Sequence, residues 1–258
     1  MDGIFNILFT QQVPESTLWT PWDPMQWVYL VLGILGIVLV LRWMTHVAPE
    51  KQSRVVAFVA AVVFSMWIIP PVLQCITDTG ERWIDHIPLH LCSSACILIP
   101  IGLLARNKPL MNYAYGLCLA GAVAAVVFPG ELYRRLSTYS FHFFLFNFSH
   151  MCIIVACLAP IALGFFRPQW RYYLSSVGIG IALMGIAYPI NKVLGSNYFF
   201  VNWPEKGTIL ESFANIAGRA MYIPVLIVVA GIVIALLFAI WTVITRVRKP
   251  AAAIPVAG

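Results

Sequence analysis

Apolar residues occur along this chain in long runs that are separated by short polar stretches. A helical run of about 20 apolar residues is long enough to cross the ~30 Å hydrocarbon core of a bilayer. Proline interrupts two of the runs, at Pro70-Pro71 and at Pro189, where we expect a helix to kink or end. The predicted fold is all-α and polytopic, with seven transmembrane helices. They lie at about residues 26–44, 55–74, 86–105, 111–129, 142–165, 172–194 and 219–245.

Lysine and arginine are unevenly distributed between these spans. One side carries ten of the 16 basic residues and, among the acids, only Glu50. Because basic loops stay in the cytoplasm, this side is predicted to be cytoplasmic, with the N-terminus outside and the C-terminus inside. The chain then divides into an extracytoplasmic segment (1–25), a seven-helix domain (26–247) and a disordered cytoplasmic tail (248–258). The ten basic residues are Arg42, Lys51, Arg54, Arg106, Lys108, Arg167, Arg171, Arg246, Arg248 and Lys249.

Composition agrees with a membrane protein. Of the 258 residues, 61% are hydrophobic and 10% are charged, whereas a soluble domain has about 25% charged residues. The net charge of +6 is accounted for by the basic loops, so no nucleic-acid partner is predicted. The six cysteines lie within or beside apolar runs, which argues against a disulfide scaffold.

Two polar strings stand out, because ionisable groups inside a membrane are costly. His86-Ile87-Pro88-Leu89-His90-Leu91-Cys92 opens the third span, and residues 142–150 open the fifth. If the third helix begins near Asp85, Cys92 lies roughly 10 Å below its start, and His150 lies roughly 12 Å below the start of the fifth. Both residues fall in the outer half of the membrane, and they meet if the two helices are neighbours.

Helix geometry divides the first string. His86 and His90 are four residues apart and share a face, whereas Cys92 lies about 200° around the helix from His90. On the fifth helix, Asn147 and His150 share a face, while His142 near the outer end is expected to be solvated.

One interpretation makes Cys92 a nucleophile and His150 its general base. A thiol among apolar groups is a poor nucleophile, and a nearby imidazole is what activates it. The product is a thioester acyl-enzyme, which is cleaved by water or by a second acceptor.

A second interpretation is a zinc hydrolase, in which His86, His90 and one of His142, His150 or Asp85 hold the metal. Zinc hydrolases of the ceramidase type carry a histidine pair on their last helix, and residues 219–245 contain no histidine.

A third interpretation is a transporter or a lipid-binding protein without catalysis. Transporters usually show internal repeats or broken helices near the membrane midplane, and no repeat is evident in this sequence.

The residues of the two strings also resemble a known family. His86 to Cys92 is similar to the H-x-P-L-H-x-C string of YwaF-type bacterial integral membrane proteins. Asn147-Phe148-Ser149-His150 resembles the second signature of that family, and Leu194-Gly195-Ser196-Asn197-Tyr198 resembles the third. The family is related to transmembrane protein 164, a cysteine-dependent acyltransferase, and more distantly to the androgen-induced-gene lipid hydrolases.

The resemblance implies a membrane-embedded phospholipid acyltransferase or acyl hydrolase in a bacterial cytoplasmic membrane. It implies Cys92 as the acyl acceptor and His150 as the base, with neither a metal nor a cofactor. We expect His86, His90 and Asn147 to orient His150 or to donate to the oxyanion. Asn191, Asn197 and Tyr198 are expected to line the head-group side.

Overall fold

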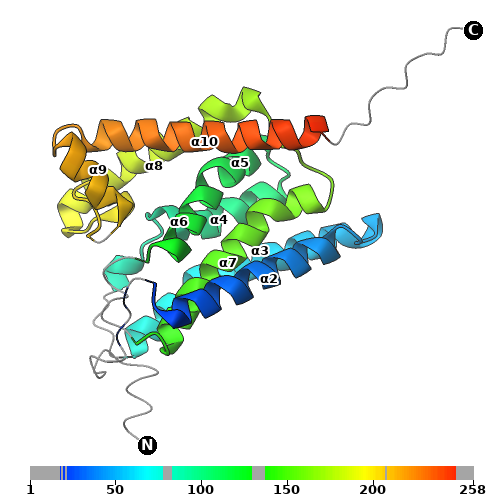
Figure 1. Ribbon diagram of the computed structural model, residues 1–258, viewed down its shortest axis with the longest axis horizontal. Coiled ribbons are helices and arrows are strands. Elements are labelled where there is room, and N and C mark those ends of the chain that lie inside the picture. Colours follow the sequence, from blue (N-terminus) through cyan, green and yellow to red (C-terminus); the bar gives the residue numbers. More distant parts are fainter. Residues whose placement is uncertain are drawn as a thin grey trace, which may run out of the picture.

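The computed structural model describes residues 18, 20, 22–77, 83–129, 137–206 and 208–247. Within these residues the fold is helical, and the β-structure is limited to an isolated bridge between Leu18 and Ser137. Figure 1 shows long helices that lie side by side and cross at shallow angles. The predictions for segment 1–25, for most of its length, and for the tail 248–258 lie outside the described residues, as do Arg134 and Arg135 on the fourth loop.

Six helices among the described residues are long and apolar enough to cross a membrane. A seventh, α4 (Leu91–Leu104), is apolar but has only 14 residues. The prediction of an all-α polytopic membrane protein is confirmed. The six long helices are α2 (Pro24–Met44), α3 (Pro49–Ile76), α5 to α6 (Lys108–Val127), α7 (Phe141–Ala162), α8 with the turn η5 (Trp170–Leu194), and α10 (Tyr222–Val247).

Proline does not end the helices that contain it. Helix α3 continues through Pro70-Pro71 to Ile76, and α8 continues through Pro189 to Leu194. Tertiary packing compensates for the missing amide hydrogen bonds, since α3 packs along α4 and α7, and α8 packs against α5 and α10. Helix α8 ends instead at Gly195, which has a left-handed φ of 64°.

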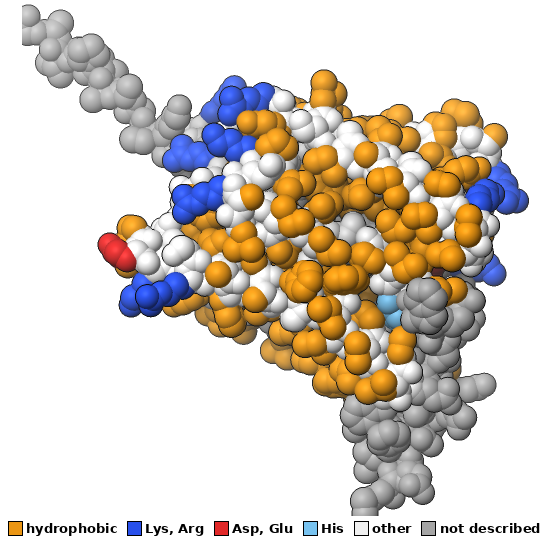
Figure 2. Space-filling model, turned by 180° about the vertical axis from the view of Figure 1, so that it is seen from behind, with side chains coloured by type: hydrophobic (Ala, Val, Ile, Leu, Met, Phe, Trp, Pro, Cys, Tyr) orange, Lys and Arg blue, Asp and Glu red, His pale blue; other side chains and the backbone are white. Residues whose placement is uncertain are grey.

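The core of the bundle lies between α3, α4, the α5–α6 segment and α7, and α10 adds Ile234 and Phe238. Helices α2 and α10 lie on the outside of this core in Figure 1. Their outer faces are apolar, with Leu32 61% exposed and Val228 60% exposed. Such faces suit contact with lipid tails. Figure 2 shows the same division, with basic side chains at the two ends and a broad hydrophobic band between them.

A π-helical turn, η3 (Ala114–Cys118), interrupts the α5–α6 segment at the centre of the bundle. A Cβ on Gly116 of this turn would lie 2.9 Å from the Ile234 side chain of α10. Glycine therefore permits the close approach of these two helices. Single π-turns are frequent near functional sites, and η3 contacts both α4 and α7, which carry the candidate residues.

Candidate functional site

Cys92 is the second residue of α4, in the first turn of that helix. Amide groups at a helix N-terminus have no partners within the helix and carry partial positive charge. A developing oxyanion next to these amides is stabilised by that charge. The position of Cys92 is therefore chemically favourable in a way that the sequence pattern did not indicate.

The start of α4 differs from the prediction. Trp83–His86 forms a separate 3₁₀ turn, η2, and α4 begins only at Leu91. Pro88 explains the difference, because proline disfavours helical conformation in the residue before it. The predictions that this helix begins near Asp85 and that His86 and His90 share a helix face are wrong.

His90 is the N-cap of α4 and forms a capping box with Ser93. The His90 amide donates to the Ser93 hydroxyl at 3.1 Å. The His90 ring lies 5.3 Å from the ring of Tyr198 and 5.1 Å from that of Phe200. His90 therefore connects the first turn of α4 to the loop that follows α8.

That loop contains a 3₁₀ turn, η6 (Tyr198–Phe200). Phe199 and Phe200 have φ angles of 56° and 54°, which are uncommon for residues with bulky side chains. The Tyr198 hydroxyl donates to the Ile84 carbonyl, so the turn is held against the residues before α4. Backbone strain of this kind persists only where surrounding contacts enforce it.

Asn191 and Asn197 hold this loop together. Asn191 Oδ1 accepts from the Ser196 hydroxyl at 2.9 Å and from the Tyr198 backbone amide at 2.7 Å. Asn197 accepts from the Asn202 amide at 3.1 Å and donates to the Trp203 carbonyl at 2.9 Å. The structure thus gives both asparagines a positioning role, and their contact with a head group stays a prediction.

His150 lies on α7 and is 7% exposed. Its Nδ1 atom is 2.7 Å from the Phe146 carbonyl oxygen. Because a carbonyl oxygen only accepts hydrogen bonds, Nδ1 carries the hydrogen and the neutral ring keeps its lone pair on Nε2. This tautomer is the one that a general base with Nε2 as proton acceptor requires.

Asn147 is one turn before His150 and is 2% exposed. Its Nδ2 donates to the Phe143 carbonyl at 2.9 Å. Its Oδ1 is buried and has no hydrogen-bond partner among the described residues. Most buried polar atoms have partners, so this oxygen is suited to a donor that a substrate would supply.

Helices α4 and α7 are in contact, as the prediction of a meeting point requires. Cys92 packs against the same core cluster as Met151 and Cys152, the two residues that follow His150. The Cys92 thiol is also close enough to the Cys157 thiol for their charges to interact. Cys157 lies two turns after His150 on α7. The face of α7 that carries Cys157 also carries His150, because the two are seven residues apart.

Tyr113 lies close to the nucleophile candidate and was missed by the sequence pattern. It is fully buried, and its hydroxyl lies within hydrogen-bonding reach of the Ser94 and Cys118 side chains. The available signal was a tyrosine near the start of the predicted span 111–129. All six cysteines are free, in agreement with the prediction that they form no disulfide scaffold.

The zinc interpretation lacks a set of ligands. No three histidine, cysteine, aspartate or glutamate side chains lie together in a way that could hold a metal ion, as far as the described residues go. His142 is 2% exposed, and its Nε2 lies 2.7 Å from the Thr77 hydroxyl. The expectation that His142 is solvated is wrong, because the start of α7 packs against α3.

A sequence model of the TMEM164 family matches residues 18–242, most of the chain. The chain belongs to the TMEM164 family. The relation inferred from the three sequence signatures is therefore confirmed.

One relative of this TMEM164 family member is an uncharacterized protein of Treponema pallidum (strain Nichols). It is 27% identical over 129 residues, which cover 48% of this chain and 50% of the relative. The matching region thus spans about half the length of that relative. No solved structure matches the chain.

Proposed function

We propose that this TMEM164 family member is a lipid acyltransferase or acyl hydrolase that uses Cys92 and His150. The observation that carries the proposal is the hydrogen bond from His150 Nδ1 to the Phe146 carbonyl, which leaves Nε2 to accept a proton on a helix in contact with α4. The position of Cys92 in the first turn of α4 adds support, since amides at a helix N-terminus can stabilise an oxyanion that forms beside the sulfur.

In the first half-reaction, the Cys92 thiol transfers its proton to His150 Nε2, and the sulfur attacks the carbonyl carbon of an acyl ester. A sulfur–carbon bond forms, the ester carbon–oxygen bond breaks, and His150 returns the proton to the leaving alcohol. Backbone amides at the start of α4 would stabilise the oxyanion. The products are a thioester on Cys92 and a lipid that lacks one acyl chain.

In the second half-reaction, water or a lipid hydroxyl gives its proton to His150 Nε2 and attacks the thioester. The carbon–sulfur bond breaks, and the thiolate recovers the proton from His150. Asn147 Oδ1 is the acceptor that would orient the incoming hydroxyl. With a lipid hydroxyl the enzyme is a transferase, and with water it is a hydrolase.

The substrate in this proposal is a phospholipid in a bacterial cytoplasmic membrane, and the site faces the outer leaflet. The apolar outer faces of the bundle allow a lipid to reach the site from the side. The loop around η6, held by Asn191 and Asn197, would cover the head group.

Intact mass spectrometry tests the covalent step. The purified protein is incubated with phospholipids of each main head-group class, and an added mass equal to one acyl chain is expected on the wild type. Cys92→Ser should abolish the thioester. Cys75→Ser is the matched control, because Cys75 is an exposed free cysteine at the end of α3 and should not affect the adduct.

Absence of the adduct and of lipid turnover in the wild type, with every lipid class, would contradict the proposal and favour a binding role. Substrate flux that persists in Cys92→Ser would favour a transporter.

A further inference from the structure

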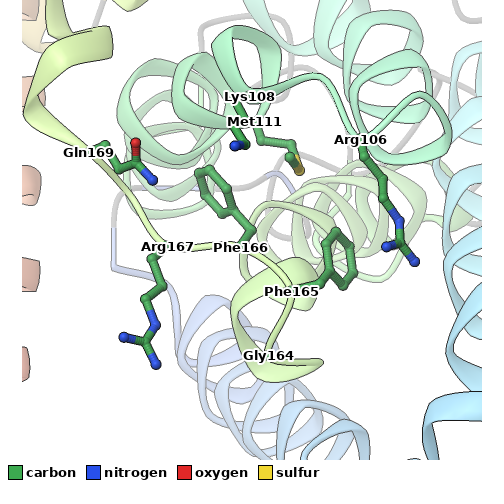
Figure 3. Close-up of a pocket in the computed structure, with 8 residues that line it drawn as sticks. All are labelled: Arg106, Lys108, Met111, Gly164, Phe165, Phe166, Arg167 and Gln169. Carbon is green, nitrogen blue, oxygen red and sulfur yellow. The ribbon is translucent and has the colours of Figure 1, made fainter.

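A cavity of about 340 Å³ lies at the end of the bundle opposite Cys92. It is bounded by the loop after α4, the start of α5 and the loop after α7 (Figure 3). Cys92 opens α4 and Arg106 follows its last turn, so roughly 20 Å of helix separates the two sites. The cavity is therefore distinct from the candidate acyl-transfer site.

Three basic residues from these separate segments line the cavity: Arg106, Lys108 and Arg167. All three are exposed, and no acidic residue is among the lining residues. Figure 3 shows the rings of Phe165 and Phe166 between Arg106 on one side and Arg167 on the other. The cavity is therefore lined by three positively charged side chains and by the apolar rings of Phe165 and Phe166.

Arg106 occupies an unusual backbone position. Its φ is 50°, in the left-handed region where glycine is the usual residue after a helix. The Arg106 amide bonds to the Leu103 carbonyl and the Asn107 amide to the Gly102 carbonyl, which is the pattern of a Schellman end. An arginine here is conformationally unfavourable, and its guanidinium carbon lies 5.1 Å from the centre of the Phe165 ring.

The walls of the cavity are fixed by hydrogen bonds. The Gln169 amide donates to Asn112 Oδ1 at 2.8 Å, and Gln52 Nε2 donates to the Leu163 carbonyl at 3.0 Å. The Pro160 carbonyl accepts from the amides of Phe165 and Phe166. Carbonyl groups at the end of α7 that would repel an anion are thus already engaged, and the loop is held in place before any ligand arrives.

Orientation of the protein in the membrane does not by itself explain this arrangement. Topology needs only basic residues in the loop on one side, and Arg246 on the same side satisfies that role without lining the cavity. Three cations from separate segments line one cavity, one of them at a left-handed φ, and this arrangement favours an anion as the ligand. Arginine matches the geometry of phosphate oxygens and forms paired hydrogen bonds with them.

We propose that this cavity binds a phosphate group, supplied by an anionic lipid head group or by a soluble phosphate compound. The oxygens would contact Arg106, Lys108 and Arg167. If a lipid supplies the phosphate, Phe165 and Phe166 would contact the first carbons of its chains.

Native mass spectrometry of the full-length protein in detergent tests the proposal. The probes are dioctanoyl phosphatidic acid, dioctanoylglycerol as the same lipid without phosphate, and inorganic phosphate with chloride at equal ionic strength. We expect binding of the phosphate-bearing probes and none of dioctanoylglycerol or chloride. If inorganic phosphate competes with phosphatidic acid, the cavity accepts a soluble phosphate compound. If it does not compete, the phosphate comes from a lipid head group.

Arg106→Gly separates ligand binding from folding, because glycine relieves the left-handed backbone while it removes the charge. We expect roughly tenfold weaker binding of phosphatidic acid, the loss of one charged hydrogen-bonding partner. The unfolding midpoint of the ligand-free variant should be unchanged or higher. Arg167→Gln should weaken binding similarly.

Arg246→Gln is the matched control and should bind like the wild type. Equal weakening in Arg246→Gln would overturn the proposal, because it would show a general effect of charge. Binding that is unchanged in an Arg106→Gly, Arg167→Gln double variant, or equal binding of dioctanoylglycerol, would also overturn it. None of these results depends on whether Cys92 forms a thioester.

Discussion

His150 and Asn147 each present an unprotonated acceptor on the same turn of α7. The lone pair of His150 lies on Nε2, because Nδ1 donates to the Phe146 carbonyl. Asn147 presents Oδ1, because Nδ2 donates to the Phe143 carbonyl. Asn147 Oδ1 is buried without a partner among the described residues, and a thiol or a substrate hydroxyl has the hydrogen that this oxygen or His150 Nε2 could accept. In each of these side chains, a backbone carbonyl binds one nitrogen, and this hydrogen bond decides which other atom is left to accept a proton or a hydrogen bond.

The first prediction concerns Asn147. Replacement by leucine removes a buried carbonyl oxygen that has no partner, so the free energy of unfolding should stay the same or rise by about 1 kcal/mol. Release of the acyl chain from Cys92 should become slower, because the incoming hydroxyl loses its acceptor. Denaturation and a time course of the thioester by mass spectrometry measure the two effects. A thioester that decays as fast as in the wild type would contradict this role.

The second prediction separates the two buried histidines of α7. His150→Gln should slow thioester formation by roughly 10²- to 10⁴-fold, the usual contribution of a general base. His142→Gln should lower stability by about 1 kcal/mol, because it disturbs the hydrogen bond with Thr77, and should leave the rate of thioester formation near that of the wild type. Rapid quenching followed by mass spectrometry measures the rates. Equal loss of rate in both variants would argue against a base at His150.

At the scale of the elements, the ends of helices decide how the site is arranged. Helix α4 begins at Leu91 with His90 as its cap, and the cap packs against η6 at the end of α8. The start of one helix is thus positioned by the loop that ends another. Gly195 terminates α8 with a left-handed φ of 64° and directs the chain into that loop.

The third prediction compares two glycines of α8. Gly195→Ala should lower the free energy of unfolding by about 1 kcal/mol, because a Cβ is unfavourable at a left-handed φ. Gly185→Ala should raise it by about 0.5–1 kcal/mol, because Gly185 is inside the helix and a Cβ there would have no atom within 4 Å. Unfolding of both variants in mixed detergent micelles measures the difference. Equal effects of the same sign would contradict the prediction.

At the scale of the whole molecule, the two proposed sites lie at opposite ends of the bundle. The cavity lined by Arg106, Lys108 and Arg167 lies at one end, and the loop around η6 lies at the other, where α8 ends. In the orientation predicted from the basic loops, the cavity would lie on the cytoplasmic side and Cys92 in the outer half of the membrane. Each proposed site would then face a different leaflet of the membrane.

The fourth prediction tests this orientation. Cys75 is exposed at the C-terminal end of α3, which is predicted to face outside, so a membrane-impermeant maleimide should label it from outside the cytoplasmic membrane. In a Cys75→Ser background, Arg246→Cys should react only after the membrane is permeabilised. Labelling of intact spheroplasts measures both. The reverse pattern would invert the predicted topology and place the proposed acyl-transfer site at Cys92 in the inner leaflet.

The sequence by itself determined the helical membrane fold, the approximate spans and the residues of chemical interest, because apolar runs and costly polar groups are local properties of the chain. The family relation was also readable from three short signatures. Tertiary structure decided the features that depend on residues far apart in sequence. It placed the start of α4 after Pro88, buried His142 against Thr77, and selected the tautomer of His150. It also brought Arg106, Lys108 and Arg167 around one cavity, because convergence of three segments is set by helix packing, which no single segment encodes.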